Sequence, residues 1–295
     1  MTAKIIDGKK IAQDIRSELK IKVQQLRDQG RNIPGLVAIL VGSNPASQSY
    51  VASKDKACRE VGMRSVVERL PENTPEHELL EMIDKYNKDN DFHGILVQLP
   101  LPKQIDENKV IEAIDPLKDV DGFHPISVGN LVIGTDTFYP CTPYGIVEML
   151  KRYNIETKGK HVVVVGRSNI VGKPIANMLL QKKENANAIV TVCHSAARDL
   201  SKYTLSADIL IAAIGSPEFI KADMISPGAV IIDVGINRVE DTSVPKGYRI
   251  VGDVDYLPVS EKASYITPVP GGVGALTPTM LLVNTYNSFI KSFNK

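Results

Sequence analysis

The chain has 295 residues, of which 43% are hydrophobic and 23% charged, so it is long enough for about two domains with their own cores. Its net charge of +1 excludes the broad positive field of a nucleic-acid-binding protein and leaves any anion binding to local sites. Three widely spaced cysteines, Cys58, Cys141 and Cys193, predict neither a disulfide framework nor a metal site. No apolar run approaches the roughly 18 residues that span a bilayer, and the first residues carry no targeting pattern, so we expect a cytoplasmic protein without a membrane anchor.

The first half alternates helices with apolar runs. Residues 7–29 have apolar side chains at helical spacing, and Gly30 stands where a C-cap is expected. Thr74 is a candidate N-cap, with His77 at the capping-box position. Residues 36–41 form a continuous apolar run, which is typical of a strand covered on both faces. The remaining predicted elements here are helix 47–61, strand 66–70, helix 74–87, strand 94–99 and helix 108–113.

The second half repeats the alternation. A helix is predicted from about Thr142 to Tyr153, and residues 181–188 are predicted as a surface loop. Strands are predicted over 161–166, 188–193, 209–213 and 230–234, and helices over 172–181 and 278–293. Strands that alternate with helices predict parallel sheets. The predicted fold is α/β with two domains, an N-terminal α/β catalytic domain and a Rossmann-type doubly wound parallel sheet, with a cleft between them. We expect the last helix to pack on the first domain.

A glycine-containing turn follows the strand predicted over 161–166. Residues 166–172 (GRSNIVG) lead from this strand into a helix, which is the setting in which Rossmann sheets hold a pyrophosphate. Glycine lets the backbone approach the phosphates, and the helix N-terminus supplies free N–H groups. Ser168 stands where the second glycine of the usual G-x-G-x-x-G pattern would be. A tight strand-to-helix turn without a ligand is therefore the alternative.

The residues around this turn favour NADP over NAD. An NAD site carries an acidic residue about 20 positions on, which binds the ribose 2′-hydroxyl. Here the strand over 188–193 ends in His194-Ser195-Ala196 without an acid. Ser195 can donate to a 2′-phosphate, and Arg167 can neutralise its charge. Taken singly, Arg167 could be a solvated loop residue and Ser195 a helix N-cap.

Four polar residues of the first half are expected to meet at one rim. Tyr50 and Lys54 share a face of the predicted helix. Gln98 lies near the end of its strand, on the rim where doubly wound sheets place ligands, and Asp121 follows in a turn. Such a set suits proton transfer by a lysine with a tuned pKa. Each residue also has a structural explanation: a surface cation, a core edge, a hydrogen bond at a sheet edge, and a turn role that fits Asp119 as well as Asp121.

Six segments, several of them long and unusual, form a distinctive set. They are residues 46–54 (ASQSYVASK), 97–102 (VQLPLP), 118–123 (KDVDGF), 140–143 (PCTP), 165–172 (VGRSNIVG) and 266–274 (ITPVPGGVG). Together they resemble the methylenetetrahydrofolate dehydrogenase/cyclohydrolase family, often called FolD, and they occur in the family's order almost from end to end of the chain.

The resemblance implies two reactions of one-carbon metabolism, which supplies purine biosynthesis. 5,10-Methylenetetrahydrofolate is oxidised with NADP to 5,10-methenyltetrahydrofolate, which is then hydrolysed to 10-formyltetrahydrofolate. The resemblance also implies a homodimer. It implies a folate-binding catalytic domain over 1–140, completed by the helix over 276–295, and an NADP-binding domain over 141–275.

The resemblance also implies the site residues. Lys54 is the catalytic lysine of the hydrolytic step, assisted by Gln98; Tyr50 packs along the folate and orients the lysine; Asp121 is the partner of the pterin ring. The substrate-binding residues implied are Tyr50, Val51, Ala52, Ser53, Lys54, Val97, Gln98, Leu99, Asp121, Pro270, Gly271, Gly272, Val273 and Gly274. Those implied for NADP are Gly166, Arg167, Ser168, Ser195 and Ile236, and no metal is implied.

One loop departs from the family pattern. Where the family commonly continues Gly-Pro-Met-Thr, this chain has Gly274-Ala275-Leu276-Thr277 followed by Pro278, which the first turn of a helix tolerates. We expect this change to affect details of folate binding and not the activity itself.

Two other functions fit parts of the pattern. A Rossmann dehydrogenase of shikimate or amino-acid type leaves the segments over 97–102 and 270–274 without an explanation. A non-enzymatic NADP-binding sensor does not explain why Tyr50, Lys54, Gln98 and Asp121 occur together.

Overall fold

The computed structural model describes residues 2–293 and divides the chain into two compact units. The first unit combines Gln13–Cys141 with Pro278–Lys295, and the second combines Met1–Ala12 with Thr142–Thr277. Each unit contains a parallel sheet with helices between its strands, so the predicted two-domain α/β class is confirmed. The first twelve residues belong to the second unit, where β1 (Lys4–Ile5) pairs in parallel with β11 (Tyr265–Ile266).

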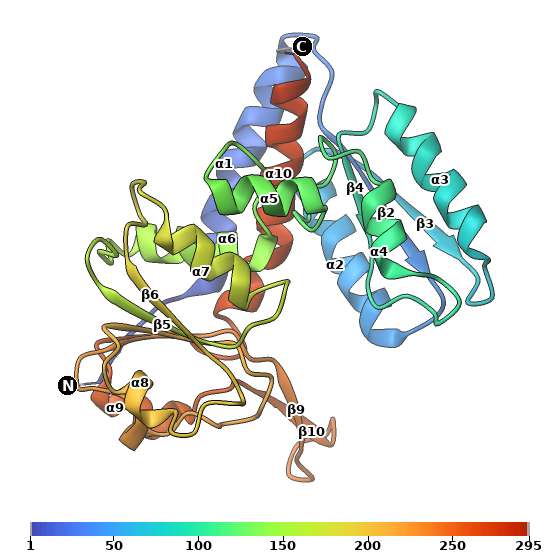
Figure 1. Ribbon diagram of the computed structural model, residues 1–295. Coiled ribbons are helices and arrows are strands. Elements are labelled where there is room, and N and C mark those ends of the chain that lie inside the picture. The colour runs from blue at the N-terminus through green and yellow to red at the C-terminus, as the bar shows by residue number, and fades with distance from the viewer. Residues whose placement is uncertain (1, 294–295) are drawn as a thin grey trace. The chain divides into compact units, whose positions relative to one another are not determined.

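In the first unit, a parallel sheet has the strand order β3-β2-β4 (Figure 1). Its central strand β2 (Gly35–Val41) is buried along its whole length, as a continuous apolar run predicts. One hydrophobic cluster joins this sheet to α3 through Leu79, Ile83 and Tyr86. The other elements are β3 (Arg64–Leu70), β4 (Gly94–Val97), α2 (Pro45–Glu60), α3 (Glu76–Lys88), α4 (Glu107–Ala113), α5 (Pro125–Ile133), α10 (Thr277–Ser292) and α1 (Gly8–Asp28), which belongs to this unit from Gln13 onward.

In the second unit, a six-stranded parallel sheet has the order β1-β11-β8-β7-β5-β6. The chain leaves β5 for β6 on one side and then returns to β7 on the other, so the order reverses between β5 and β7. Doubly wound sheets bind ligands at such a switch point, at the carboxyl ends of the strands. The elements are β5 (His161–Val165), β6 (Ile189–Cys193), β7 (Ile209–Ala212), β8 (Val230–Asp233), α6 (Cys141–Arg152), α7 (Gly172–Leu180), α8 (Ser201–Thr204) and α9 (Tyr256–Lys262).

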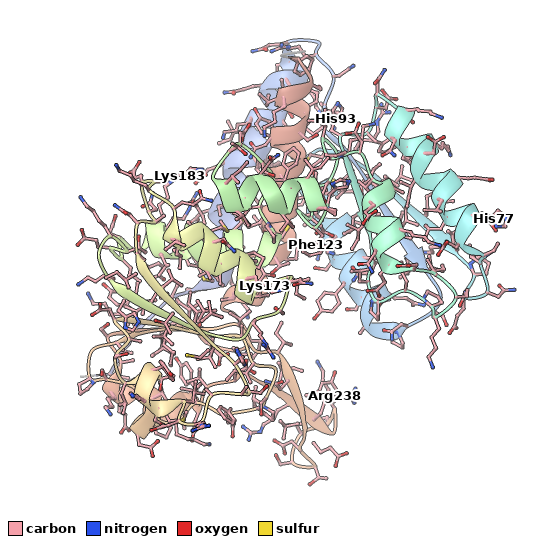
Figure 2. The ribbon with its side chains drawn as sticks, in the orientation of Figure 1. His77, His93, Phe123, Lys173, Lys183 and Arg238 are labelled. Atoms are coloured by element: carbon pink, nitrogen blue, oxygen red, sulfur yellow. The ribbon has the colours of Figure 1, made fainter. Side chains whose placement is uncertain are left out.

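Several elements of the structure were not predicted, among them a hairpin of the second unit and helix α5 of the first. An antiparallel hairpin joins β9 (Asn237–Glu240) to β10 (Tyr248–Val251), and Arg238 lies on it (Figure 2). The Arg238 guanidinium carbon lies 3.7 Å from the centroid of the Tyr248 ring. Helix α5 has recognisable end signals, because His124 caps its first turn, Pro125 begins it and Gly134 ends it with φ 81°.

Two local predictions are wrong. Thr74 does not cap α3, because its hydroxyl donates to the Pro71 carbonyl at 2.7 Å and Pro75 stands at the N-cap position. His77 therefore takes no part in a capping box. The strand predicted over 94–99 ends at Val97. Pro100 and Pro102 lack the N–H groups that a longer strand would need, which explains the early end.

Helix α10 packs within the first unit, although it comes last in the chain. The Asn284 side chain donates to the carbonyls of Val120 and Tyr139, both at 2.8 Å, and the Ser288 hydroxyl donates to the Leu117 carbonyl at 2.7 Å. Pro278 lies in the first turn of α10, where its missing N–H costs nothing. Over residues 2–293, no helix is both long and apolar enough to cross a membrane.

Candidate functional site

Lys54 and Gln98 contact each other directly. Asn44 caps α2 by accepting from the N–H groups of Ala46 and Ser47, and Lys54 follows on the buried face of that helix with only 9% of its surface exposed. Its Nζ donates to Gln98 Oε1 at 3.1 Å. The Gln98 amide is itself held, because its Nε2 donates to the Leu99 carbonyl at 2.7 Å. The amide oxygen is therefore fixed toward the lysine nitrogen.

The neighbours of Lys54 on α2 divide into buried and exposed residues. Tyr50, one turn before Lys54, is 49% exposed and available to a ligand. Ala52 and Ser53 are also exposed, whereas the Val51 side chain lies in the core. On β4 and just after it, the Val97 side chain is in the core and Leu99 is partly exposed. Contacts from Val51 and Val97 to a ligand would come from their backbone atoms.

The segment over 118–122 has one aspartate that shapes the turn and another that does not. Asp119 is buried, and its carboxylate accepts from the N–H groups of Gly122 and Phe123 through Oδ1 and of His124 through Oδ2. The carboxylate of Asp121 accepts none of these bonds. The turn role that fitted both residues therefore belongs to Asp119, and Asp121 remains available for chemistry.

Asp121 lies in the electrostatic field of Lys54. Burial raises the pKa of Asp121, and the nearby Lys54 charge opposes that rise. The Cys141 thiol is 3.7 Å from Asp121 Oδ1, and burial together with the Asp121 charge raises the pKa of Cys141 well above its usual value. The thiol therefore stays protonated and acts as a weak donor instead of a nucleophile. Of the four residues expected to meet at one rim, Lys54 thus contacts Gln98 directly and interacts electrostatically with Asp121.

Two residues of this site were missed in the sequence. Cys141 contacts Asp121 and also donates to the Val120 carbonyl at 3.5 Å. Asn284 of α10 donates to that same carbonyl and so fixes the backbone next to Asp121. A polar amide within the apolar run MLLVNTYNSF was the available signal for Asn284.

In the second unit, the turn after β5 has the shape that a pyrophosphate needs. Gly166 has φ 134°, and a Cβ on Gly172 would collide with the Gly166 carbonyl, so neither position accepts a side chain. The Ser168 hydroxyl accepts from the N–H groups of Val171 and Gly172 at the start of α7, at 3.1 and 3.3 Å. The hydroxyl performs the capping role, and the glycines allow close approach, so the residues fit a dinucleotide.

The groups proposed for a 2′-phosphate lie at the end of β6. Arg167 Nη1 is 3.4 Å from His194 Nε2, so the turn after β5 and the residues after β6 meet there. Ser195 is exposed and caps no helix, since α8 begins at Ser201 with Leu200 at its N-cap. The alternative role for Ser195 as an N-cap is therefore excluded. His194 was not among the predicted site residues.

A pocket of about 350 Å³ joins the loop over 270–274 to Ile236 in the second unit. Asp233 and Lys9 also line it. A Cβ on Gly274 would come within 3.0 Å of the Ile236 side chain, and Gly271 has φ 116°. Ile236, predicted to contact the coenzyme through its main chain, and the predicted folate-side loop over 270–274 therefore line the same pocket of this unit. The loop over 270–274 stays glycine-rich because its backbone approaches its neighbours closely.

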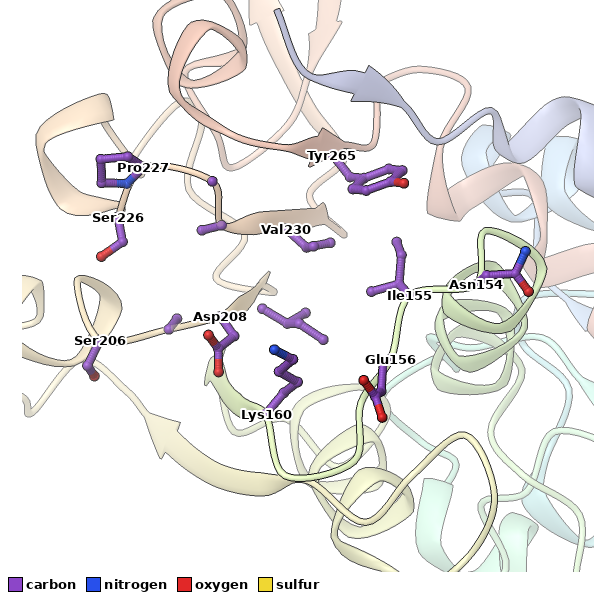
Figure 3. A pocket seen from close by; sticks show the side chains of 14 residues that line it. Asn154, Ile155, Glu156, Lys160, Ser206, Asp208, Ser226, Pro227, Val230 and Tyr265 are labelled. Atoms are coloured by element: carbon purple, nitrogen blue, oxygen red, sulfur yellow. The ribbon is translucent and has the colours of Figure 1, made fainter. Parts of the chain in front are cut away.

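A second pocket, of about 410 Å³, lies at the amino ends of the strands of the same sheet (Figure 3). Lys160, Asp208, Val230 and Tyr265 line it, at or just before the amino ends of β5, β7, β8 and β11. Doubly wound sheets bind their ligands at the carboxyl ends of the strands, so this pocket is not the coenzyme site. Among residues 2–293, no group of three or more His, Cys, Asp or Glu side chains could hold a metal ion.

Comparison with known proteins identifies the family. The model of the tetrahydrofolate dehydrogenase/cyclohydrolase catalytic domain matches residues 6–121, and that of the family's NAD(P)-binding domain matches residues 140–293. A protein from Chlorobium phaeobacteroides named bifunctional protein FolD is 61% identical over 287 residues, which cover 97% of each chain.

Solved structures agree with this result. A bifunctional FolD enzyme from Campylobacter jejuni is 50% identical with a TM-score of 0.92, covering 98% of this chain and 99% of its own. A methylenetetrahydrofolate dehydrogenase-cyclohydrolase from Trypanosoma brucei, solved with NADP and an inhibitor, is 39% identical with a TM-score of 0.93, covering 100% of both chains. A shikimate 5-dehydrogenase from Thermus thermophilus, 16% identical with a TM-score of 0.51, shares the fold alone. The chain therefore belongs to the tetrahydrofolate dehydrogenase/cyclohydrolase family, and its second half matches that family's NAD(P)-binding domain.

Proposed function

We propose that Lys54, Gln98 and Asp121 form the folate site at which this enzyme carries out both of its reactions. In the first, NADP accepts a hydride from the methylene carbon of 5,10-methylenetetrahydrofolate. In the second, water adds to the resulting 5,10-methenyl cation, and the ring opens to 10-formyltetrahydrofolate. The observation that carries the proposal is the contact between Lys54 Nζ and the immobilised Gln98 amide. The Lys54 charge also lowers the pKa of Asp121, against the effect of burial.

The two reactions make different demands on Lys54. Loss of hydride from a carbon flanked by two nitrogens gives a cation that those nitrogens stabilise, so this step needs no strong base. Addition of water requires that a proton leave the attacking oxygen and that another reach the departing nitrogen. Lys54 is the group that transfers these protons. The Gln98 side-chain oxygen holds the Lys54 nitrogen in place through a hydrogen bond. Tyr50, exposed one turn away, packs along the folate.

Asp121 is the proposed anchor of the pterin. The aminopyrimidine edge of a folate presents paired N–H donors, which a carboxylate can accept together. The Asp121 carboxylate is free for this because Asp119 makes the hydrogen bonds of the turn. Residues 270–274 supply the folate-side loop of the second unit, as the family resemblance implies.

The NADP contacts follow from the turn after β5. Gly166 and Ser168 receive the pyrophosphate, because the glycine leaves the backbone uncovered and α7 begins there. Arg167 and Ser195 hold the 2′-phosphate, and Ile236 contributes main-chain contacts. The proximity of Arg167 to His194 supports this assignment, because it brings the turn after β5 to the end of β6.

Turnover in solution tests the proposed function. Purified protein mixed with 5,10-methylenetetrahydrofolate and NADP should show an absorbance rise from reduced coenzyme, and the methenyl product should then disappear as it is hydrolysed. The same assay separates the alternatives, since neither a shikimate-type dehydrogenase nor a coenzyme sensor would consume this folate. Coenzyme binding without folate turnover would reject the proposal.

We also propose a cytoplasmic homodimer. The three cysteines are buried and free, which fits a reducing compartment. Strand β6 is an edge of its sheet and leaves Ile189 and Val192 63% and 40% exposed, an apolar edge that a second copy would cover. Sedimentation equilibrium should give a dimer for the unmodified protein and a folded monomer for Val192→Lys. A monomeric unmodified protein would reject the dimer.

A further inference from the structure

Two buried carboxylates of the second unit have no part in the proposed chemistry. Asp233 ends β8 and Asp253 follows β10, and their side chains are only 3% and 0% exposed. A buried carboxylate must be matched by hydrogen-bond donors. The donors around these two residues therefore show which parts of the chain they hold in place.

Asp253 holds the loop that follows β7. Its Oδ2 accepts from the backbone N–H groups of Ile214 at 2.6 Å and Gly215 at 3.0 Å, and its Oδ1 accepts from that of Ser216 at 3.0 Å. Three consecutive N–H groups thus converge on one carboxylate, which fixes the loop after β7. Oδ1 also accepts from Asn237 Nδ2 at 2.9 Å, which ties in the segment after β8.

The loop that Asp253 holds touches the glycine turn of the proposed NADP site. Ala213, the first residue of the loop, donates its N–H to the Val165 carbonyl at 2.8 Å. A Cβ on Gly166 would collide with the Ala213 carbonyl, so the two backbones are in contact. Asn237 directly follows Ile236, which is proposed to contact the coenzyme through its main chain. Asp253 therefore links both segments that border the coenzyme on this side of the switch point.

Asp233 holds Asp253 in turn. Its Oδ1 accepts from the N–H groups of Gly235 and Asp253, both at 2.9 Å, and its Oδ2 accepts from that of Val254 at 3.0 Å. A Cβ on Gly252 would collide with the Asp233 carboxylate, and one on Gly235 would collide with that of Asp253. These glycines let the backbone reach the two carboxylates. Burial raises the pKa of Asp233 to about 7.

We infer that Asp253 is a positioning residue for the coenzyme. Its carboxylate does not touch NADP, but it fixes the loop over 213–216 and the segment over 236–237 in the arrangement that receives the dinucleotide. The inference rests on the proposed location of NADP at the turn after β5. It predicts that a weakened Asp253 impairs NADP binding and leaves the folate chemistry of the first unit intact.

Asp253→Asn is the direct test. Asparagine keeps the size of the side chain but replaces one carboxylate oxygen by an N–H₂ group, which cannot accept a hydrogen bond. The N–H groups that donate to that oxygen in the unmodified protein therefore lose their partner. The Kd and KM for NADP should rise about tenfold or more. The dehydrogenase kcat at saturating NADP should stay within about threefold of the unmodified value, because the reacting groups are unchanged. Hydrolysis of added 5,10-methenyltetrahydrofolate uses no coenzyme and should be unchanged.

Asp255→Asn is the matched control, because Asp255 lies two residues further on and pairs with Lys221 Nζ at the surface. This variant should bind NADP normally. An unchanged Kd for NADP in Asp253→Asn would overturn the inference. So would an equal loss of hydrolysis and NADP binding, because that would indicate a general structural role.

If Asp253→Asn does not fold, Asn237→Ala decides the matter. It removes a single donor to the same carboxylate and should raise the Kd for NADP a few-fold, and no rise would overturn the inference. Failure of the proposed function is a separate result. It would appear as an unmodified protein that does not turn over the folate, or as unchanged NADP affinity in Arg167→Ala.

Discussion

The segment over 118–122 shows neighbouring residues that serve folding and chemistry separately. Lys118 Nζ donates to the carbonyls of Tyr86 and Asp89, and the Asp119 carboxylate accepts three backbone N–H groups. Both of these side chains shape the loop. Asp121 makes none of those bonds and faces Lys54 and Cys141 instead. Substitution of Asp121 should therefore affect folate binding, whereas substitution of Asp119 should affect the stability of the fold.

Asp121→Asn should weaken folate binding without lowering the melting temperature. The substitution replaces one acceptor by a donor that faces the donors of the pterin, which costs roughly 1–3 kcal/mol, or about a five- to 150-fold loss of affinity. Both activities should fall together, and NADP affinity without folate should be unchanged. Titration with a folate analogue and with NADP measures this. Unchanged folate affinity would remove the anchor role.

Asp119→Asn is the counterpart and should destabilise the fold. It weakens three hydrogen bonds to a buried carboxylate, so its melting temperature should fall by several degrees. A variant as stable as the unmodified protein would contradict the division of roles between the two aspartates.

Arg167→Ala tests the coenzyme assignment. A charge-assisted contact to the 2′-phosphate is worth roughly 1.5–3 kcal/mol, so the KM for NADP should rise about ten- to hundredfold. The weak use of NAD, which has no 2′-phosphate, should hardly change. Lys173→Ala is a suitable control, because Lys173 is an exposed cation near the same turn and its Nζ donates to Asn169. Equal effects on NADP and NAD would contradict the assignment.

Helix α10 supports both the sheet and the proposed folate site of the first unit. Its Asn284 fixes the backbone beside Asp121, and its Phe289 ring packs edge-on against His93 at 4.9 Å. His93 lies inside this unit and its Nδ1 accepts from the Gly35 N–H at 3.2 Å, whereas His77 projects from the surface (Figure 2). One buried histidine thus connects β2 to the last helix.

The His93 environment predicts a loss of stability in mild acid. Burial, aided by Lys118, lowers the pKa of His93 from 6.5 to about 4, against the smaller opposing effects of Asp91 and Asp89. Between these values the unfolded chain binds a proton that the folded one does not, so this stabilisation is complete above pH 6.5 and is lost as the pH falls toward 4. The total is on the order of 3 kcal/mol.

The difference between the unmodified protein and His93→Gln isolates this effect from other titrations. The free energy of unfolding of the unmodified protein should fall relative to that of His93→Gln as the pH is lowered from 7 to 5. His77→Gln, at an exposed position, should follow the unmodified protein. Parallel curves for the unmodified protein and His93→Gln would contradict the account.

The sequence predicted those elements whose signals are local. Continuous apolar runs predicted β2 and β5, and helical periodicity predicted α1. The β9–β10 hairpin was missed because its strands are only four residues long and consist mostly of exposed and partly buried residues. The Thr74 cap was wrong because the hydroxyl had a nearer partner in the preceding Pro71 carbonyl.

Over the whole molecule, the predictable part of the site follows from the parallel sheets. Because strand ends gather at one rim, Gln98 and the helix after β2 could be placed together before any contact was known. Cys141 and Asn284 could not, since they bond to Val120 from 21 and 164 residues further along the chain. The sequence could not assign the turn-forming role to Asp119 and the site role to Asp121, because each residue fits an Asp-containing turn. Asp253 was missed because its partners lie on a separate loop after β7.

Lys54 is proposed to serve the hydrolytic step and to be dispensable for hydride loss. Lys54→Met measures it most directly, with both activities assayed on one preparation. Lys56→Met, at an exposed position of the same helix, serves as the control. Hydrolysis of 5,10-methenyltetrahydrofolate should fall by roughly a hundredfold or more, while NADP-dependent oxidation of 5,10-methylenetetrahydrofolate stays measurable. Equal loss of the two activities in a folded Lys54→Met protein with normal folate affinity would contradict the account.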